Sequence, residues 1–131
     1  MRALRHASGA AAASLRDLFA RSRAYRWLTA VSLLLVALTA FLPFWKVFPR
    51  ATPGMYVPLH GTVYFGVDQF GPWWRLFTPA AFGLAVLAVN VAVGAWAFRR
   101  ERLIALFFLG LTVFVETVLL IASTFMVLLN L

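Results

Sequence analysis

One acidic side chain in the middle of a long apolar run is the first candidate for chemistry. Glu116 is the only charged residue in the segment 103–131, which is long enough to cross a membrane. Acidic residues at membrane depth are costly, so they indicate a functional role by default, and desolvation favours the neutral acid. Three interpretations stay open for it: a hydrogen bond that fixes helix register, a polar contact with another subunit, or a proton or cation relay.

A single histidine is the second candidate, in a stretch rich in aromatic residues at 46–77. The imidazole of His60 can be an axial ligand of a haem or chlorophyll, but a lone loop histidine more often packs and hydrogen-bonds. The chain has no cysteine and its other histidine is His6, so no metal site is predicted. Without a nucleophile–base pair, paired carboxylates or a glycine-rich phosphate loop, we expect no catalytic residues, no enzymatic activity and no required cofactor.

The same stretch holds the other residues expected to contact a partner or lipid. Its prolines and glycines preclude a long helix over 49–72, and 57–65 is compatible with a short extended segment or a hairpin. The segment 72–77 is predicted to form a short interfacial turn. Asp68 is expected either to cap this turn or to form an ion pair with Arg75. The predicted contact residues of this stretch are His60, Tyr64, Asp68, Trp73, Trp74 and Arg75.

Composition places these candidates in a membrane protein. Hydrophobic residues make up 63% of the 131-residue chain and charged residues only 12%, against roughly 25% charged in soluble domains. A core of this size cannot hide so much apolar surface from water, so lipid must cover much of it. The net charge of +8 is not spread like a nucleic-acid surface, because six of the twelve basic residues lie in 1–26 and three in 99–102.

Three apolar segments, 27–45, 78–98 and 103–131, are predicted to span the membrane. Tryptophan bounds the first segment at both ends, as expected for interfacial anchors. The third is about 43 Å long at 1.5 Å per residue, so it should tilt or project. The predicted fold class is therefore all-α membrane: three transmembrane helices in a small bundle, with an aromatic Pro/Gly-rich external loop and an N-terminal interfacial basic segment.

The basic residues predict the orientation of these spans. They place the tail at 1–26 and the turn at 99–102 in the cytoplasm, and the 46–77 loop and the C-terminus outside, in a multi-pass protein of the cell (inner) membrane. Within the tail, a capping box that starts at Ser14 predicts a short helix lying on anionic headgroups.

Each predicted span carries small or polar residues at alternating spacings of three and four. Such a stripe is typical of a helix–helix seam, where small residues allow close approach and polar ones hydrogen-bond in lipid. We therefore expect the three stripes to face one another. They consist of Thr29, Ser32, Val36, Thr39 and Pro43; of Gly83, Leu87, Asn90, Gly94 and Ala97; and of Leu109, Thr112, Glu116, Leu119, Ser123, Met126 and Asn130.

Depth along each helix predicts the partners of Glu116. At 1.5 Å per residue from the cytoplasmic end of each predicted helix, Glu116 is about 19 Å deep and Thr39 about 18 Å deep. Thr39 is thus the expected partner, with Asn90 about one turn away at about 12 Å and Gly83 leaving room opposite. The predicted intramembrane polar contacts are Glu116, Asn90, Thr39, Thr112 and Ser123.

The external loop also carries a recognisable pattern. Residues 64–74 read YFGVDQFGPWW, and Asn90 and the 99–102 turn follow. Over residues 40–131 the chain resembles a group of small, uncharacterised bacterial three-helix integral membrane proteins with a YFG[IV]D…GPW motif. The resemblance implies a three-helix membrane fold and attaches no activity, cofactor or site.

These observations predict a non-enzymatic accessory or scaffold subunit of a larger membrane complex, which associates with the membrane helices of other subunits or with itself. Three short helices leave little room for a catalytic site, whereas a polar seam and an aromatic loop suit association. Two other interpretations stay open. One is a small oligomeric proton or ion transporter that uses Glu116, and the other is a pigment-, quinone- or lipid-binding protein that uses the aromatic loop.

Overall fold

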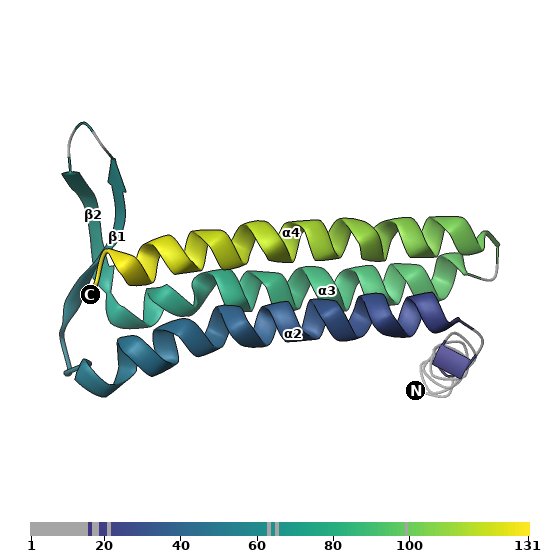
Figure 1. Ribbon diagram of the computed structural model, residues 1–131, viewed down its shortest axis with the longest axis horizontal. Coiled ribbons are helices and arrows are strands. Elements are labelled where there is room, and N and C mark those ends of the chain that lie inside the picture. Colours follow the sequence, from purple (N-terminus) through teal and green to yellow (C-terminus); the bar gives the residue numbers. More distant parts are fainter. Residues whose placement is uncertain (1–15, 17–18, 21, 63, 65, 99) are drawn as a thin grey trace, which may run out of the picture.

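Three long helices lie side by side, and a two-stranded hairpin leaves one end of the bundle (Figure 1). The computed structural model describes residues 16, 19–20, 22–62, 64, 66–98 and 100–131. The helices are α2 (Arg23–Lys46), α3 (Thr78–Ala97) and α4 (Arg102–Leu128), the strands are β1 (Tyr56–Thr62) and β2 (Gly66–Pro72), and two short 3-10 helices are η1 (Phe48–Arg50) and η2 (Trp73–Phe77).

All three helices are long and apolar enough to cross a membrane, which confirms the predicted bundle of three helices and supports a multi-pass membrane protein. Large apolar side chains such as Leu34, Phe82 and Phe114 point outward from them. Exposure of so much apolar surface to water is unfavourable, so lipid is expected to cover the outside of the bundle.

The first helix begins earlier than predicted. Ser22 is its N-cap, with a hydroxyl that accepts the backbone N–H of Tyr25 at 3.2 Å, so 23–26 belong to α2 and not to the tail. The predicted start of an interfacial helix at Ser14 lies outside the described residues, although Arg16, Phe19 and Ala20 are helical. A serine side chain satisfies one of the free N–H groups at a helix start, which explains why α2 can begin at this point.

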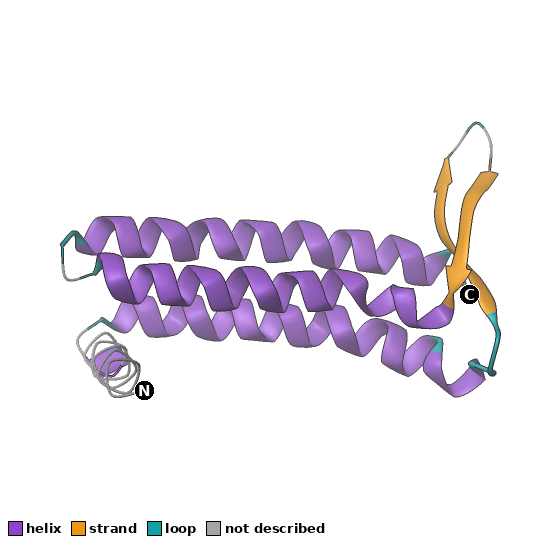
Figure 2. Ribbon diagram, turned by 180° about the vertical axis from the view of Figure 1, so that it is seen from behind, coloured by secondary structure: helices purple, strands orange, loops and turns teal. Residues whose placement is uncertain are grey.

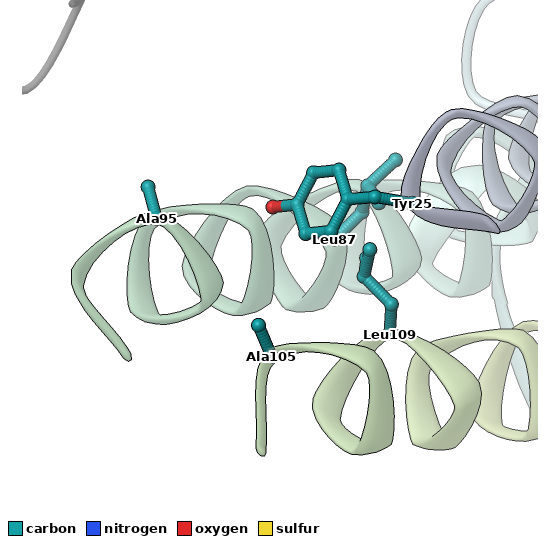
Figure 3. Close-up of a cluster of buried hydrophobic side chains, with 5 residues drawn as sticks. All are labelled: Tyr25, Leu87, Ala95, Ala105 and Leu109. Atoms are coloured by element: carbon teal, nitrogen blue, oxygen red, sulfur yellow. The ribbon is translucent and has the colours of Figure 1, made fainter. Parts of the chain in front are cut away.

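Tyr25 fills the space between the three helices at the end of the bundle far from the hairpin (Figure 3). Its hydroxyl donates a hydrogen bond to the carbonyl oxygen of Val91 on α3 at 3.2 Å. A Cβ atom at Gly94 would lie 3.0 Å from this hydroxyl, so glycine allows the ring to approach α3. The buried cluster consists of Tyr25, Leu87, Ala95, Ala105 and Leu109.

The hairpin closes the opposite end and then extends past α4, as both views show (Figures 1 and 2). Its antiparallel pairing runs from Tyr56 opposite Pro72 to Thr62 opposite Gly66, with an irregularity around His60. The hairpin is longer than the 57–65 segment considered from the sequence, because 66–72 form the second strand. A second buried cluster, made of Val47, Val57, Leu59 and Leu76, packs the base of the hairpin onto the bundle.

Candidate functional site

The small and polar stripes meet inside the bundle, as their spacing predicts. Twelve of the stripe positions are buried, while Val36, Asn90, Leu119, Met126 and Asn130 are partly exposed. Close packing of backbones through small residues is a common way for helices to associate in lipid. The buried members are Thr29, Ser32, Thr39, Pro43, Gly83, Leu87, Gly94, Ala97, Leu109, Thr112, Glu116 and Ser123.

Glu116 is completely enclosed by the three helices of its own chain. Its side chain is 0% exposed, and neither carboxyl oxygen has a hydrogen-bond partner among the described residues. A Cβ atom at Gly83 would overlap Oε2 and lie 3.0 Å from Cδ, so the carboxyl group rests directly on the α3 backbone. The predicted room at Gly83 is therefore occupied by Glu116 itself.

Two polar contacts set the register of α2 against α4. Near one end, the Arg102 guanidinium donates to the Ser22 hydroxyl at 3.4 Å, a separation of 80 residues along the chain. Farther along, the Ser123 hydroxyl donates to the carbonyl oxygen of Thr39 at 3.1 Å, a separation of 84 residues. A residue of α2 therefore lies level with the α4 residue that follows it by 80–84 positions.

This register places Ser32 level with the turn of α4 that carries Glu116. The Ser32 hydroxyl is also buried without a partner among the described residues, so the unpaired polar atoms of both side chains belong to one level of the bundle. Buried polar groups are nearly always hydrogen-bonded, so two such residues at one level are unusual. The serine was visible in the sequence as a stripe member, but only the register connects it to Glu116.

The predicted partner of Glu116 is wrong. The Thr39 hydroxyl donates to the carbonyl oxygen of Leu35 in its own helix at 2.8 Å. The depth count failed because α2 begins at Arg23 and is displaced along α4, so that Thr39 lies level with Ser123, about two turns beyond Glu116.

Asn90 also bonds elsewhere. Its amide donates to the Thr112 hydroxyl at 2.7 Å, and this hydroxyl donates to the Phe108 carbonyl oxygen at 2.9 Å. The pair joins α3 to α4 about one turn from Glu116. The structure thus brings Asn90 and Thr112 together, and Thr39 and Ser123 together, while Glu116 joins neither pair.

The polar residues of the hairpin form a pair of their own. His60 Nδ1 lies 2.8 Å from Asp68 Oδ1, and both side chains are exposed, at 59% and 41%. The prediction that Asp68 caps the 72–77 turn or pairs with Arg75 is wrong, because the strand pairing carries Asp68 to His60 instead. Pro72 is the N-cap of η2, without a side-chain hydrogen bond, and the Arg75 guanidinium lies 5.9 Å from the ring centre of Trp74.

The aromatic candidates divide between outward and inward positions. Tyr64 at the tip is 91% exposed, and Trp74 also points outward. Trp73 packs edge-on between Phe48 and Phe77, with ring centres 5.7 Å and 6.4 Å apart. Trp73 therefore supports the base of the hairpin, whereas Tyr64 and Trp74 are available for contacts.

Asn130 has a role that the stripe did not reveal. Its amide donates to the carbonyl oxygens of Pro58 at 2.8 Å and of Met126 at 2.7 Å, so it ties β1 to the end of α4. Within the described ranges, no group of three His, Cys, Asp or Glu side chains could hold a metal ion.

Comparisons with known proteins add no functional assignment. No protein-family model, curated protein or solved structure matches the chain. The resemblance to three-helix proteins with a YFG[IV]D…GPW motif therefore stays a prediction.

Proposed function

We propose that the chain is a non-enzymatic scaffold or accessory subunit that binds another membrane protein through the β1–β2 hairpin. The observation that carries the proposal is the exposure of the outer half of the hairpin. All five residues of β2 at 66–70 are exposed, so neither face of the strand is covered there by the bundle. An isolated two-stranded hairpin is only marginally stable in water, which favours a partner that covers it.

The hairpin offers two kinds of contact to such a partner. Tyr56, Tyr64 and Phe70 present large exposed rings, and aromatic residues are enriched at the centres of protein interfaces. Within the described ranges of the chain the sheet has two strands, so each strand also keeps one edge free of pairing within the sheet. A free edge can accept an extended segment of a partner by strand addition.

The interior of the bundle argues against a transport pathway as the main function. Glu116 faces the centre of a single chain, whereas an oligomeric channel would need it to face a water-filled lumen between subunits. The same enclosure keeps other subunits away from its carboxyl group. Contacts with partners are therefore expected at the hairpin and not along the polar stripes.

The orientation follows the charge distribution. The basic tail, Arg100 in the turn and Arg102 at the start of α4 face the cytoplasm, where they contact anionic headgroups, and the hairpin faces the outside of the cell (inner) membrane. The partner is another membrane protein with an external surface, or a second copy of this chain.

Purification of the tagged protein from its native membrane in mild detergent tests the proposal. We expect a second chain, or a second copy, to copurify with the wild type and to be lost when Tyr64→Ser and Phe70→Ser are combined. Phe107→Leu is the matched control, because Phe107 is an exposed aromatic residue on α4 far from the hairpin. A wild-type protein that purifies only as a monomer would rule the proposal out.

A further inference from the structure

The hairpin forms a fixed overhang beside the end of α4. Leu59 on β1 is buried in the cluster at the hairpin base, and Asn130 holds the neighbouring Pro58 carbonyl at 2.8 Å. A Cβ atom at Gly61 would lie 3.5 Å from the Leu129 side chain, so the strand stays close to the helix farther out as well. The space between them is thus bounded on two sides by elements that are tied together.

This space is a groove of about 450 Å³, lined by β1 on one side and by the end of α4 with its C-cap on the other. Its lining includes Leu59, His60 and Gly61 of β1, Ala122 and Phe125 of α4, and the C-cap residue Leu129. Its volume is within the range of small-molecule sites, which is roughly 300–1,000 Å³. The α4 side is entirely apolar, and the polar His60–Asp68 pair belongs to the strand side. The groove therefore suits an elongated apolar group with a polar end.

The position of the groove indicates where such a group comes from. At 1.5 Å per residue, α4 is about 40 Å long, which exceeds a hydrocarbon core of about 30 Å. A helix longer than that core reaches the headgroup level with its ends, and the last two turns of α4 form one such end. Phe125, which lines the groove, is 64% exposed, and its neighbours Ile121 and Leu128 on α4 also point outward. The groove therefore borders the apolar outer surface of α4 that lipid is expected to cover.

We propose that the groove between β1 and the last two turns of α4 binds one acyl chain of a phospholipid from the adjacent leaflet. The chain lies against Ala122, Phe125 and Leu129, and the headgroup end faces the His60–Asp68 pair. A lipid that merely surrounds the bundle would contact α4 but would not reach β1. A bound chain contacts both elements, and this difference makes the site testable without knowledge of the partner protein.

Photolabelling of the full chain in phospholipid nanodiscs tests the site, with a phosphatidylcholine that carries a photoreactive diazirine in its acyl chain. Peptide mass spectrometry should find adducts on 59–61 of β1 and 122–129 of α4, several-fold above those on 82–89 of α3. Adducts spread evenly over α3 and α4, with none on β1, would overturn the proposal.

A variant that fills the groove provides the second test. Ala122→Phe should lower the adducts on 59–61 several-fold, whereas Ala85→Phe, the same change on the outward face of α3, should leave them unchanged. Adducts on β1 that persist in A122F, or that a long-chain quinone removes at a lower mole fraction than unlabelled phosphatidylcholine, would overturn the assignment to a phospholipid. If A122F does not fold, the ratio of adducts on β1 to adducts on α3 in the wild type still decides whether the groove binds an acyl chain.

Discussion

The centre of the bundle and the hairpin treat their polar groups in opposite ways. Glu116 and Ser32 are buried with no partner among the described residues, whereas His60 and Asp68 are exposed to solvent and still bond each other at 2.8 Å. An exposed pair contributes about 0–1 kcal/mol, but a buried unpaired polar group costs about 1–3 kcal/mol. The Glu116 carboxyl group is therefore expected to lower the stability of the bundle, whereas the hairpin pair should change it little.

The largest effect is expected where the carboxyl group touches α3. Gly83→Leu forces a side chain into the position of Glu116, and overpacking of this kind costs about 1–3 kcal/mol or more. The free energy of unfolding, measured by denaturant titration in detergent micelles, should fall accordingly.

Gly110→Leu is the matched control for that substitution. Among the residues that the structure describes, nothing lies within 4 Å of a Cβ atom at Gly110, which faces outward from α4, so the change should alter stability by no more than about 1 kcal/mol. Adding Glu116→Ala to Gly83→Leu should restore part of the loss. Equal losses in G83L and G110L would show that Glu116 does not rest on Gly83.

Replacement of the carboxyl group itself should stabilise the bundle. Glu116→Leu removes two buried oxygens that have no partner in the described part of the chain and keeps a similar volume, so unfolding should cost about 1–3 kcal/mol more in the same titration. Glu116→Gln keeps the polar atoms and should show no such gain. A loss of stability in E116L would mean that the carboxyl group has a bonding partner, and the contrast with the hairpin would disappear.

The attachment of the hairpin gives a smaller, local effect. Asn130→Leu removes the bond to Pro58, so the amides of β1 should exchange with deuterium faster, by the equivalent of about 1 kcal/mol. Asn90→Leu also removes an amide that donates one bond, but in the bundle, and should leave β1 exchange unchanged. Unchanged β1 exchange in N130L would show that the hairpin is held by its buried base alone.

The smallest effect is expected for the exposed pair. His60→Ala should lower local stability by only about 0–1 kcal/mol and leave the unfolding of the three helices unchanged. Hydrogen exchange at β2 reports the local stability of the hairpin, and circular dichroism reports the unfolding of the helices. A loss in the helices as large as that in G83L would contradict the division between bundle and hairpin.

The spans and stripes were predictable because lipid imposes simple rules on sequence. Each helix needs a long apolar run, and the period of small and polar residues identifies its inward face, as at Thr112 and Ser123. The start of α2 was missed because Arg23 and Arg26 resemble tail charges. Long arginine side chains can instead lie on a helix end and reach the headgroups.

The surroundings of Glu116 were not predictable, since they depend on how far α2 is displaced along α4. That displacement is fixed by contacts between residues 80 and 84 positions apart, such as Ser123 with Thr39. The partner of Asp68 depends in the same way on an irregular strand register next to His60. Neither offset leaves a periodic signal in the chain.

The Ser22 hydroxyl has a consequence for the order in which the protein is assembled. It accepts the Tyr25 N–H within α2 and also the Arg102 guanidinium. The first bond can form as soon as α2 is synthesised, whereas the second must wait until α3 has returned the chain to the same membrane surface. The link between the first and last helices therefore closes late in biogenesis.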